Sequence, residues 1–407
     1  MLQTASRQTL RGSQAPVTQH PLVSIVTPSL NQGRFIRDAI ESVFRQSYPR
    51  VELIVVDAVS RDETPKILAE YADRLTAVVE PDHSQSHAIN KGFRRARGEI
   101  VSWLNCDDML LPEAVQNVVE TFARDGALGI VYGDGYLIDT KAGARCLFKA
   151  GPMNIWKLVH VSQFLLQPAA FFRRNVLDEI GYVDESLHWA MDWDLMIRAA
   201  KRFRTAYIPL PLAEQRVYDT TKTATGGRRR FRELVRIMRA HGEYRYPPAY
   251  FLYGADTYEM MLMRALERWT PQIASSATTR LRAIVRNVAE RVKLRALSDG
   301  WYWDRWVTTR AHFQFHREGR ALALCGTLPE VFPVLRGQAI DALVDGRVAV
   351  RQSLEFGKFR ILIPVKPGPR LVDVELRSPK FFVPRRRGLN EDRRKLCYLL
   401  DSIEWIP

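Results

Sequence analysis

The sequence has few cysteines, no long apolar run and no secretory signal. Its four cysteines are widely separated among 407 residues, and no two form a C-x-x-C pair. The cysteines therefore predict neither a zinc site nor a disulfide framework, and reduced thiols fit the cytosol. No apolar stretch reaches the roughly 18 residues that a membrane-spanning helix needs. Residues 1–20 are polar, so we expect a cytoplasmic protein with a flexible N-terminal tail.

The sequence also has fewer acidic than basic residues. It contains 45 Asp and Glu against 60 Lys and Arg, so its formal net charge is +15. Such a field favours nucleic acid, an acidic membrane surface or phosphorylated ligands as partners. Neither zinc-finger spacing nor an RRM-type aromatic signature accompanies the charge, so nucleic acid is not a predicted partner. An anionic membrane surface stays a candidate partner, and the length allows two or three domains.

Residues 21–210 alternate between strand and helix patterns. The apolar runs and helical stripes lie at 22–27, 34–46, 51–56, 63–73, 76–80, 86–96 and 99–104. This alternation predicts an α/β fold with a mainly parallel sheet covered on both faces. Ligands of such sheets bind at the carboxyl ends of the strands, where Asp57, Asp107 and Asp108 fall.

The pattern changes twice further along the chain. A basic stripe at 278–297 predicts either a helix packed on the core or an interfacial helix on anionic lipid. Short strands divided by Gly, Pro and Asp turns follow, and VDGRV at 344–348 signals a hairpin. We expect a β-sandwich there. The predicted parts are a tail at 1–20, an α/β domain at 21–227, a basic helical region at 228–298 and a β-sandwich at 299–407.

Three tryptophans, Trp301, Trp303 and Trp306, stand at the start of the predicted sandwich. Clustered tryptophans at a domain junction either pack in a core or offer a sugar-stacking platform. The sandwich has similar alternatives: a rigid domain packed on the helices, or a surface for carbohydrate or oligomer contact.

Asp107 and Asp108 are adjacent carboxylates at a predicted strand end. They repel each other, and a hard divalent cation such as Mg²⁺ or Mn²⁺ would hold both together with phosphate oxygens. The alternative is an N-cap for the helix behind Pro112, for which one Asp would suffice. The metal site is the favoured interpretation.

Two further carboxylates have a functional and a structural interpretation. Asp57 could accept hydrogen bonds from a nucleobase or ribose, or could form a turn. Asp192 could cap the helix that follows it, or could take a proton from an acceptor hydroxyl as general base. Asp194 lies two residues on, so we expect it to point elsewhere and to make a structural hydrogen bond.

Four stretches resemble, in this order, the family 2 glycosyltransferases with the GT-A fold. They are SIVTPSLNQGRFIRDAIESVFRQSYP, VELIVVDAVSRDET, EPDHSQSHAINKGFRRARGEIVSWLNCDD and MDWDLMIRAA. The second resembles the family's VVDGGSTDGT, and the fourth its E-D-Y-D-L-W-L-R. The third resembles the branch with D-x-G-Q-x-D-A-x-N-K-G ahead of a D-x-D-type motif. The resemblance covers about residues 21–225, half of the chain.

The resemblance implies a nucleoside-diphosphate-sugar as donor. Asp57 would contact its nucleobase, helped by the loop from Thr27 to Ser29. The matching residues of the donor-side loop are Gln85, Asn90 and Lys91. The chain departs from the family pattern at four positions nearby, which are Ala58, Val59, Ser84 and His87.

The resemblance also implies roles for the remaining carboxylates. Asp107 would face the ribose or the metal, Asp108 would bind a divalent cation (Mn²⁺ or Mg²⁺), and Asp192 would be the catalytic base. Family members usually invert the anomeric centre, with the metal offsetting charge on the leaving diphosphate. Two positions depart: Met191 stands where Glu is common, and Tyr218 where a metal-binding His is common.

The sequence thus predicts a glycosyltransferase that adds a single sugar, because the Q-x-x-R-W motif and membrane helices of the processive branch are missing. The expected acceptor is a glycan or lipid-linked glycan of a bacterial cell-envelope polysaccharide, met at the inner face of the membrane. The alternative is a glycan-binding or scaffold protein with an inactive transferase domain. A nucleotidyltransferase would need a Gly-rich first loop, which is absent. The sequence predicts neither the donor sugar nor the oligomeric state.

Overall fold

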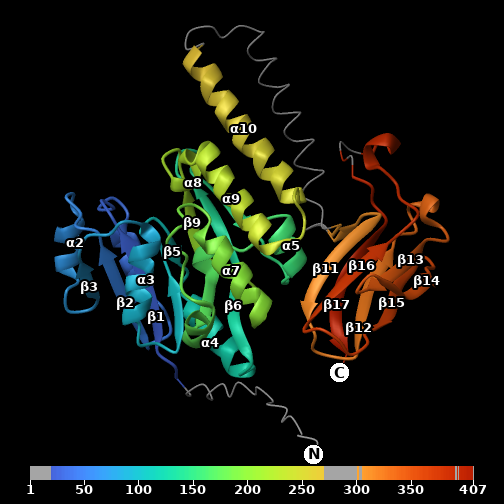
Figure 1. The fold of residues 1–407 in the computed structure, drawn as a ribbon, viewed down its shortest axis with the longest axis horizontal. Coiled ribbons are helices and arrows are strands. Elements are labelled where there is room, and N and C mark those ends of the chain that lie inside the picture. The colour runs from blue at the N-terminus through green and yellow to red at the C-terminus, as the bar shows by residue number, and fades with distance from the viewer. Residues whose placement is uncertain (1–19, 270–299, 302–304, 390–391, 393, 407) are drawn as a thin grey trace, which may run out of the picture.

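The computed structural model describes residues 20–269, 300–301, 305–389, 392 and 394–406. An α/β part comes first along the chain, helices follow it, and two antiparallel sheets come last (Figure 1). This order confirms the predicted fold class. The predicted domain boundaries stay predictions, and the basic stripe expected at 278–297 lies outside the described residues.

A nine-stranded sheet forms the α/β part, with the strand order β3-β2-β1-β4-β8-β6-β9-β5 and with β7 paired to β6. Its strands are β1 (Val23–Ser29), β2 (Val51–Asp57), β3 (Thr76–Val79), β4 (Ile100–Trp103), β5 (Met109–Leu110), β6 (Leu128–Asp139), β7 (Ala144–Phe148), β8 (Ala170–Arg173) and β9 (Arg204–Val217). The first four strands are parallel, as predicted. The later strands add antiparallel pairs, since β8 runs against both β4 and β6.

Helices cover both faces of this sheet. They are α1 (Ile36–Phe44), α2 (Thr64–Glu70), α3 (Gln85–Arg95), α4 (Ala114–Arg124), α5 (Ile155–His160), α6 (Arg174–Ile180) and α7 (Met191–Arg202). Neighbouring residues of a strand point to opposite faces. Ile25 of β1 accordingly shares a core cluster with Ile40 of α1 and Phe122 of α4. Val26 shares the second core cluster with Phe93 of α3.

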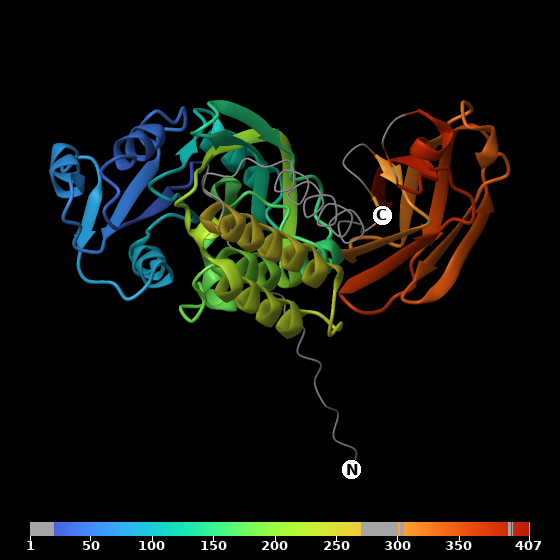
Figure 2. The same ribbon diagram turned by 90° about the horizontal axis from the view of Figure 1, so that it is seen from above.

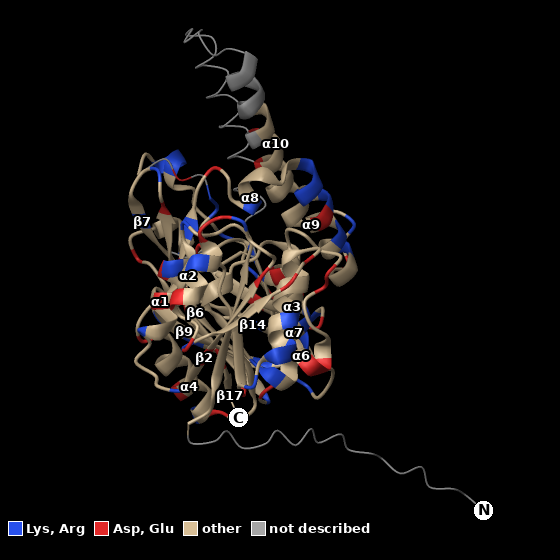
Figure 3. Ribbon diagram, turned by 90° about the vertical axis from the view of Figure 1, so that its left-hand side faces the viewer, with Lys and Arg blue, Asp and Glu red and all other residues tan. Residues whose placement is uncertain are grey.

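Three helices follow β9: α8 (Lys222–Thr225), α9 (Gly227–His241) and α10 (Pro248–Trp269). α9 buries one apolar stripe at helical spacing, which is Phe231, Leu234, Ile237 and Met238. Arginines are frequent on the rest of its surface, where Glu233 also lies, and Figure 3 shows a basic stretch along α9. Within the described part of the chain, no helix has both the length and the apolar character needed to span a membrane.

Two four-stranded antiparallel sheets form the C-terminal part, with the orders β10-β17-β12-β15 and β11-β16-β13-β14. Their strands are β10 (Trp306–Val307), β11 (Arg310–His316), β12 (Ala321–Leu328), β13 (Ala339–Val344), β14 (Arg347–Ser353), β15 (Gly357–Pro364), β16 (Leu371–Arg377) and β17 (Tyr398–Ile406). One apolar core joins the two sheets, which confirms the predicted sandwich. The VDGRV hairpin connects β13 and β14, with Asp345 and Gly346 both at positive φ.

Two of the three clustered tryptophans pack inside this part. Trp301 lies against Phe313 with ring centroids 5.8 Å apart, and Trp306 lies against Phe382 at 5.3 Å. These contacts favour the core interpretation over a sugar-stacking platform for both residues. Trp303 lies outside the described residues.

The sandwich is fixed to the α/β part through β11, and Figure 2 shows the two side by side. The buried Asn154 donates through Nδ2 to the carbonyl oxygen of His312 (2.8 Å) and accepts from the backbone N–H of Gln314 (3.2 Å). His316 Nε2 lies 2.6 Å from the carbonyl oxygen of Ala200 in α7. These contacts support the rigid-domain interpretation of the sandwich.

Candidate active site

A cleft lies where the parallel strands end, and it consists of two adjoining cavities. We call the first, of about 420 Å³, the acidic cavity, because Asp107, Asp108 and Asp192 line it. We call the second, of about 480 Å³, the loop cavity, because the chain segments after β1, β2 and β3 line it. The residues that line both cavities are Gln85, Asn105, Asp107, Thr221 and Lys222.

Asp107 and Asp108 follow β4 and enter the acidic cavity from its floor. Asp108 is buried and accepts from Asn105 Nδ2 (3.1 Å) and from the backbone N–H of Arg216 (3.2 Å). The Tyr218 hydroxyl donates to Asp107 Oδ2 at 2.8 Å. Burial raises the pKa of Asp108 well above its usual range, and the charge of Asp107 raises it further.

The N-cap alternative for this pair is wrong. The helix behind Pro112 is α4, and its N-cap position is Glu113, where the side chain makes no capping hydrogen bond. Neither Asp107 nor Asp108 therefore closes the helix. Their carboxylates are held by Tyr218, Asn105 and a backbone amide instead.

The carboxylate pair fits a divalent cation. The hydrogen bonds to Asp108 come from neutral groups, and the Arg216 guanidinium reaches past it to the Asp38 carboxylate (2.6 Å) and the Asp107 carbonyl oxygen (3.2 Å). Among the described residues no ion pair to Asp108 offsets its repulsion from Asp107, although the charge of Arg216 lowers the pKa of Asp108 in part. Oxygen ligands of this kind suit Mg²⁺ or Mn²⁺, which Asp107 and Asp108 would hold.

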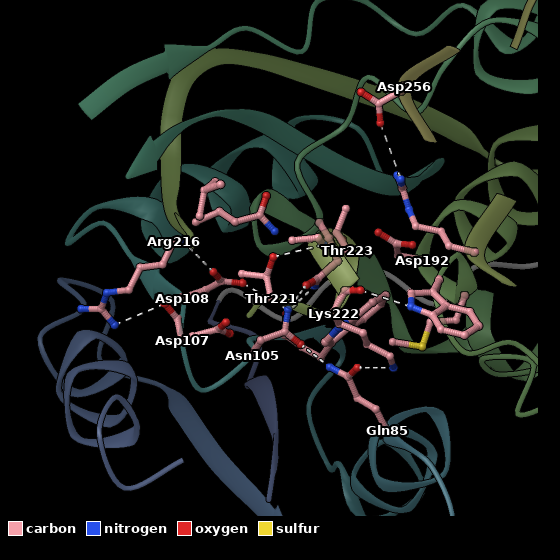
Figure 4. A pocket seen from close by; sticks show the side chains of 18 residues that line it. Gln85, Asn105, Asp107, Asp108, Asp192, Arg216, Thr221, Lys222, Thr223 and Asp256 are labelled. Atoms are coloured by element: carbon pink, nitrogen blue, oxygen red, sulfur yellow. Dashed lines mark hydrogen bonds and ion pairs between the residues drawn. The ribbon is translucent and has the colours of Figure 1, made fainter. Parts of the chain in front are cut away.

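Asp192 lies across the acidic cavity from this pair, with Thr221 and Lys222 between them (Figure 4). It is the second residue of α7, whose N-cap is Ala190, so the capping alternative is wrong for Asp192 too. Gln163 Nε2 donates to its Oδ2 at 2.8 Å. Burial raises the pKa of Asp192, and the hydrogen bond from Gln163 lowers it in part. A raised pKa brings a carboxylate closer to the range of an effective general base.

Glu233 on α9 binds the backbone of the residues that precede α7. The Glu233 carboxylate accepts the backbone N–H groups of His188 (2.9 Å), Trp189 (2.6 Å) and Ala190 (2.7 Å). A carboxylate at this end of a helix also interacts favourably with the helix dipole. Glu233 thereby fixes the chain that leads into Asp192.

Asp194 behaves as predicted, because it points away from the cleft. Its oxygens accept from Arg198 Nε and lie by His241 Nε2, both at 2.7 Å. Burial would raise the pKa of Asp194, yet His241 and Arg198 bring it below the usual value. The residue ties α7 to the end of α9.

Gln85 and Ser29 are the predicted donor-side residues that line the loop cavity. Gln85 donates through Nε2 to Asn105 Oδ1 (2.9 Å) and accepts from Lys222 Nζ (2.8 Å). Ser29 ends β1 beside Pro28 and Ala58. Thr27 is buried within β1 and lines neither cavity.

Asp57 holds a turn at the end of β2. Its oxygens accept from the backbone N–H (2.8 Å) and the hydroxyl (2.6 Å) of Ser60, across Val59 with its positive φ of 60°. The neighbouring Ala58 lines the loop cavity, and Asp57 is buried behind it. Contact between Asp57 and a nucleobase stays a prediction.

Asn90 and Lys91 line neither cavity. Asn90 exchanges two hydrogen bonds with the backbone of Val183, at 2.8 and 3.0 Å. Lys91 Nζ lies 2.7 Å from Asp82 Oδ1 and donates to the carbonyl oxygen of Pro81 at 2.8 Å. In this structure both residues brace the chain around the donor-side loop, and direct donor contact stays a prediction for them.

Lys222 is a charged cleft residue that the sequence analysis did not predict. Its side chain lines both cavities, and burial lowers the pKa of its ammonium group to about 8, against the pull of Glu233 and Asp192. The segment that carries it is pinned by Trp189, whose Nε1 donates to the Lys222 carbonyl oxygen at 3.2 Å. One sequence feature could have indicated Lys222: it lies four residues after Tyr218, in the segment where the family commonly has a metal-binding His.

Comparisons with known proteins place the chain in a family. The sequence pattern described as "Glycosyl transferase family 2" matches residues 24–181. An uncharacterized glycosyltransferase of Rickettsia typhi is 30% identical over 220 residues, which cover 51% of this chain and 68% of that protein. The chain belongs to glycosyl transferase family 2.

Two other proteins are also similar to this family 2 glycosyltransferase. The O-antigen biosynthesis protein RfbC of Myxococcus xanthus is 30% identical over 224 residues, 52% of this chain and 17% of that protein. The structure of the mannosyltransferase PcManGT from Pyrobaculum calidifontis, in complex with GDP-Man and Mn²⁺, is 22% identical with a TM-score of 0.47. That likeness covers 70% of this chain and 86% of the mannosyltransferase.

Proposed function

We propose that this family 2 glycosyltransferase transfers a single hexose-type sugar from a nucleoside-diphosphate-sugar to a hydroxyl group of a glycan or lipid-linked glycan. The transfer inverts the anomeric centre and uses a divalent cation. One observation supports the proposal most: the acidic cavity brings Asp107, Asp108 and Asp192 around one space beside the loop cavity. A polysaccharide role agrees with the relative named for O-antigen biosynthesis.

The loop cavity is proposed to take the nucleoside. It lies at the ends of β1 and β2, where Ser29 and Ala58 line it, and it opens through Gln85 and Asn105 to the acidic cavity. A nucleoside there would direct its diphosphate toward Asp107 and Asp108. The bound cation would offset the negative charge that builds on the leaving diphosphate. The Lys222 ammonium group lines both cavities and would add positive charge on the same path.

Asp192 is proposed as the general base. It would take the proton from the acceptor hydroxyl as that oxygen bonds to the anomeric carbon, while the bond to the diphosphate breaks on the opposite side. Gln163 holds one carboxylate oxygen at 2.8 Å and so orients the carboxylate. Burial favours the protonated form of this carboxylate, so it also favours proton uptake.

The test is transfer by Asp192→Asn in the presence of Mn²⁺. A positioned base contributes about 10²- to 10⁴-fold to a rate, so we expect a loss of that size in transfer with little change in donor binding. The measurements are product formation with a panel of nucleotide-sugars and donor binding by calorimetry. The matched control is Asp73→Asn, at an exposed aspartate outside the cleft. Equal transfer by wild type and Asp192→Asn would contradict the assignment.

A further inference from the structure

We propose that His83, His87 and Glu185 form a binding site for a transition-metal ion of the Zn²⁺ type, separate from the cation site at Asp107 and Asp108. One ligand atom from each of the three side chains lies within 4.8 Å of the other two. Within the described part of the chain this group is the one set of three that meets that condition. The inference concerns ion binding and does not depend on the proposed transfer reaction.

The two imidazoles and the carboxylate already face one another. The rings of His83 and His87 are stacked, with centroids 3.8 Å apart. His83 Nε2 lies 3.2 Å from Glu185 Oε2. The donor atoms around a bound Zn²⁺ stand about 2.0–2.2 Å from the ion. Because the lone pair of an imidazole nitrogen lies in the ring plane, binding requires one of the two stacked rings to turn and the three donor atoms to move closer.

Two of the three side chains lie against a second polar group. His87 Nδ1 lies 2.9 Å from Asp82 Oδ1, at ion-pair distance but without hydrogen-bond geometry, and Nε2 of that ring is left for an ion. Asn90 Nδ2 donates to Glu185 Oε1 at 2.8 Å, which leaves Oε2 on the side of His83. A carboxylate behind a metal-binding histidine and a hydrogen-bonded carboxylate ligand are common partners of zinc ligands in proteins.

The backbone positions these side chains at the start of α3. Ser84 is the N-cap of α3, and its hydroxyl accepts the backbone N–H of His87 at 3.1 Å. His83 precedes the cap, and His87 lies in the first turn. Glu185 belongs to the chain between α6 and α7, which Asn90 binds at Val183. An ion here would tie the donor-side loop to the segment that leads into Asp192.

The two cation sites differ in ligand chemistry. Imidazole nitrogens with one carboxylate suit Zn²⁺ and related transition metals, whereas a pure carboxylate set suits Mg²⁺ or Mn²⁺. Three protein ligands leave the fourth tetrahedral position to water. An ion can reach the site from solvent at His83, because that side chain is 65% exposed.

The experiment is calorimetric titration of the full chain with Zn²⁺ after removal of metals by a chelator, with metal content checked by mass spectrometry. We expect wild type to bind one ion that His83→Ala, His87→Ala and Glu185→Gln each weaken at least tenfold. Asp82→Asn, which acts through His87, should weaken binding about 10- to 100-fold. The control is His20→Ala, at an exposed histidine that starts the described chain.

A crossed design separates the two sites. Asp108→Asn should lose Mn²⁺ binding and keep the Zn²⁺ isotherm, and His83→Ala should do the reverse. His83 is exposed, so its replacement leaves the fold intact, which circular dichroism checks. The proposal is overturned if wild type binds no more Zn²⁺ than the His83→Ala, His87→Ala double variant. It is also overturned if Asp108→Asn abolishes the Zn²⁺ isotherm, because the ion would then sit on the carboxylate pair.

Discussion

At the residue scale, the cleft combines carboxylates that motif reasoning located with polar partners that it did not. Asp107 and Asp108 stand out in the sequence because two adjacent carboxylates repel each other and need a partner, and Asp192 stands out because it precedes an amphipathic helix. Lys222 and Gln163 do not stand out in the sequence, because only tertiary packing brings Lys222 into the cleft and Gln163 to the carboxylate of Asp192. Motif similarity also says nothing about where a side chain points, which is why Asn90 was grouped with donor residues although it binds Val183.

The low pKa of Lys222 predicts a pH-dependent effect on stability. Burial lowers the folded-state pKa from 10.5 to about 8, so the unfolded chain binds the proton more tightly between these pH values. The buried charge of Lys222 therefore destabilises the folded protein fully below pH 8, where the lysine is charged in both states. The destabilisation is absent above pH 10.5, where the lysine is neutral in both states. The stability of Lys222→Met relative to wild type should fall by about 1–2 kcal/mol between pH 7 and pH 10.5, allowing for partial solvation.

Chemical denaturation at several pH values measures this difference for Lys222. The matched control removes an exposed lysine of α2, Lys66→Met. A change of the same size in that control would contradict the assignment to burial. Transfer activity gives an independent readout, since Lys222→Met should also lower the rate at pH 7 by removing positive charge from the cleft.

At the element scale, the sequence predicted those strands and helices that carry a strong apolar period. The strands β1 to β4 and the helices α1 and α3 form where the apolar runs predicted them. The antiparallel pairing of β8 with β4 and β6 was not predicted, because pairing between distant strands depends on packing rather than on local pattern. Arg216 of β9 and Tyr218, which directly follows that strand, in turn reach Asp108 and Asp107 in the segment after β4.

Among the described elements, helix α9 is the best candidate for binding an anionic membrane surface. Its exposed arginines are Arg228, Arg229, Arg232, Arg236 and Arg239. Exposed aromatic side chains follow at Tyr244, Tyr246 and Phe251. Basic and aromatic side chains together suit the headgroup region of a membrane, and a lipid-linked acceptor would be met there.

Charge reversal on α9 tests whether this helix binds an anionic membrane. The triple variant Arg232→Glu, Arg236→Glu, Arg239→Glu should lose most binding to vesicles rich in phosphatidylglycerol, because each basic residue contributes about 1 kcal/mol near such a surface. Co-sedimentation measures the bound fraction. The matched control reverses three exposed sandwich arginines, Arg347, Arg360 and Arg370. Equal loss in both variants would assign binding to net charge alone.

At the scale of the whole molecule, composition and turn chemistry predicted a sandwich after an α/β part but not how the two meet. Asn154 makes the junction, since its side chain bonds to the backbone on both sides of Phe313 in β11. Nothing in the sequence around Asn154 distinguishes it from an ordinary helix cap, a role it also fills for α5. Contacts of this kind join residues far apart in the chain and leave no local pattern.

Asn154→Ala should therefore destabilise the molecule. The change leaves partly buried backbone groups of His312 and Gln314 without this partner, which costs about 1–3 kcal/mol. The midpoint of chemical denaturation measures the loss. The control is Asn117→Ala on α4, where the amide bonds to its own helix at an exposed site, and we expect a change of at most about 0.5 kcal/mol. Similar midpoints for the two variants would show that the junction contributes little.

The three amide hydrogen bonds to Glu233 carry a mechanical consequence. One end of this linkage lies on α9, whose arginines face outward, and the other end lies on the peptide that opens α7. A displacement of α9 would act through this carboxylate on the turn before Asp192, and through His241 on Asp194. The proposed contact of α9 with an anionic surface would thus be coupled to the position of Asp192, the proposed base, and an acceptor presented at that surface would meet a carboxylate already oriented toward it.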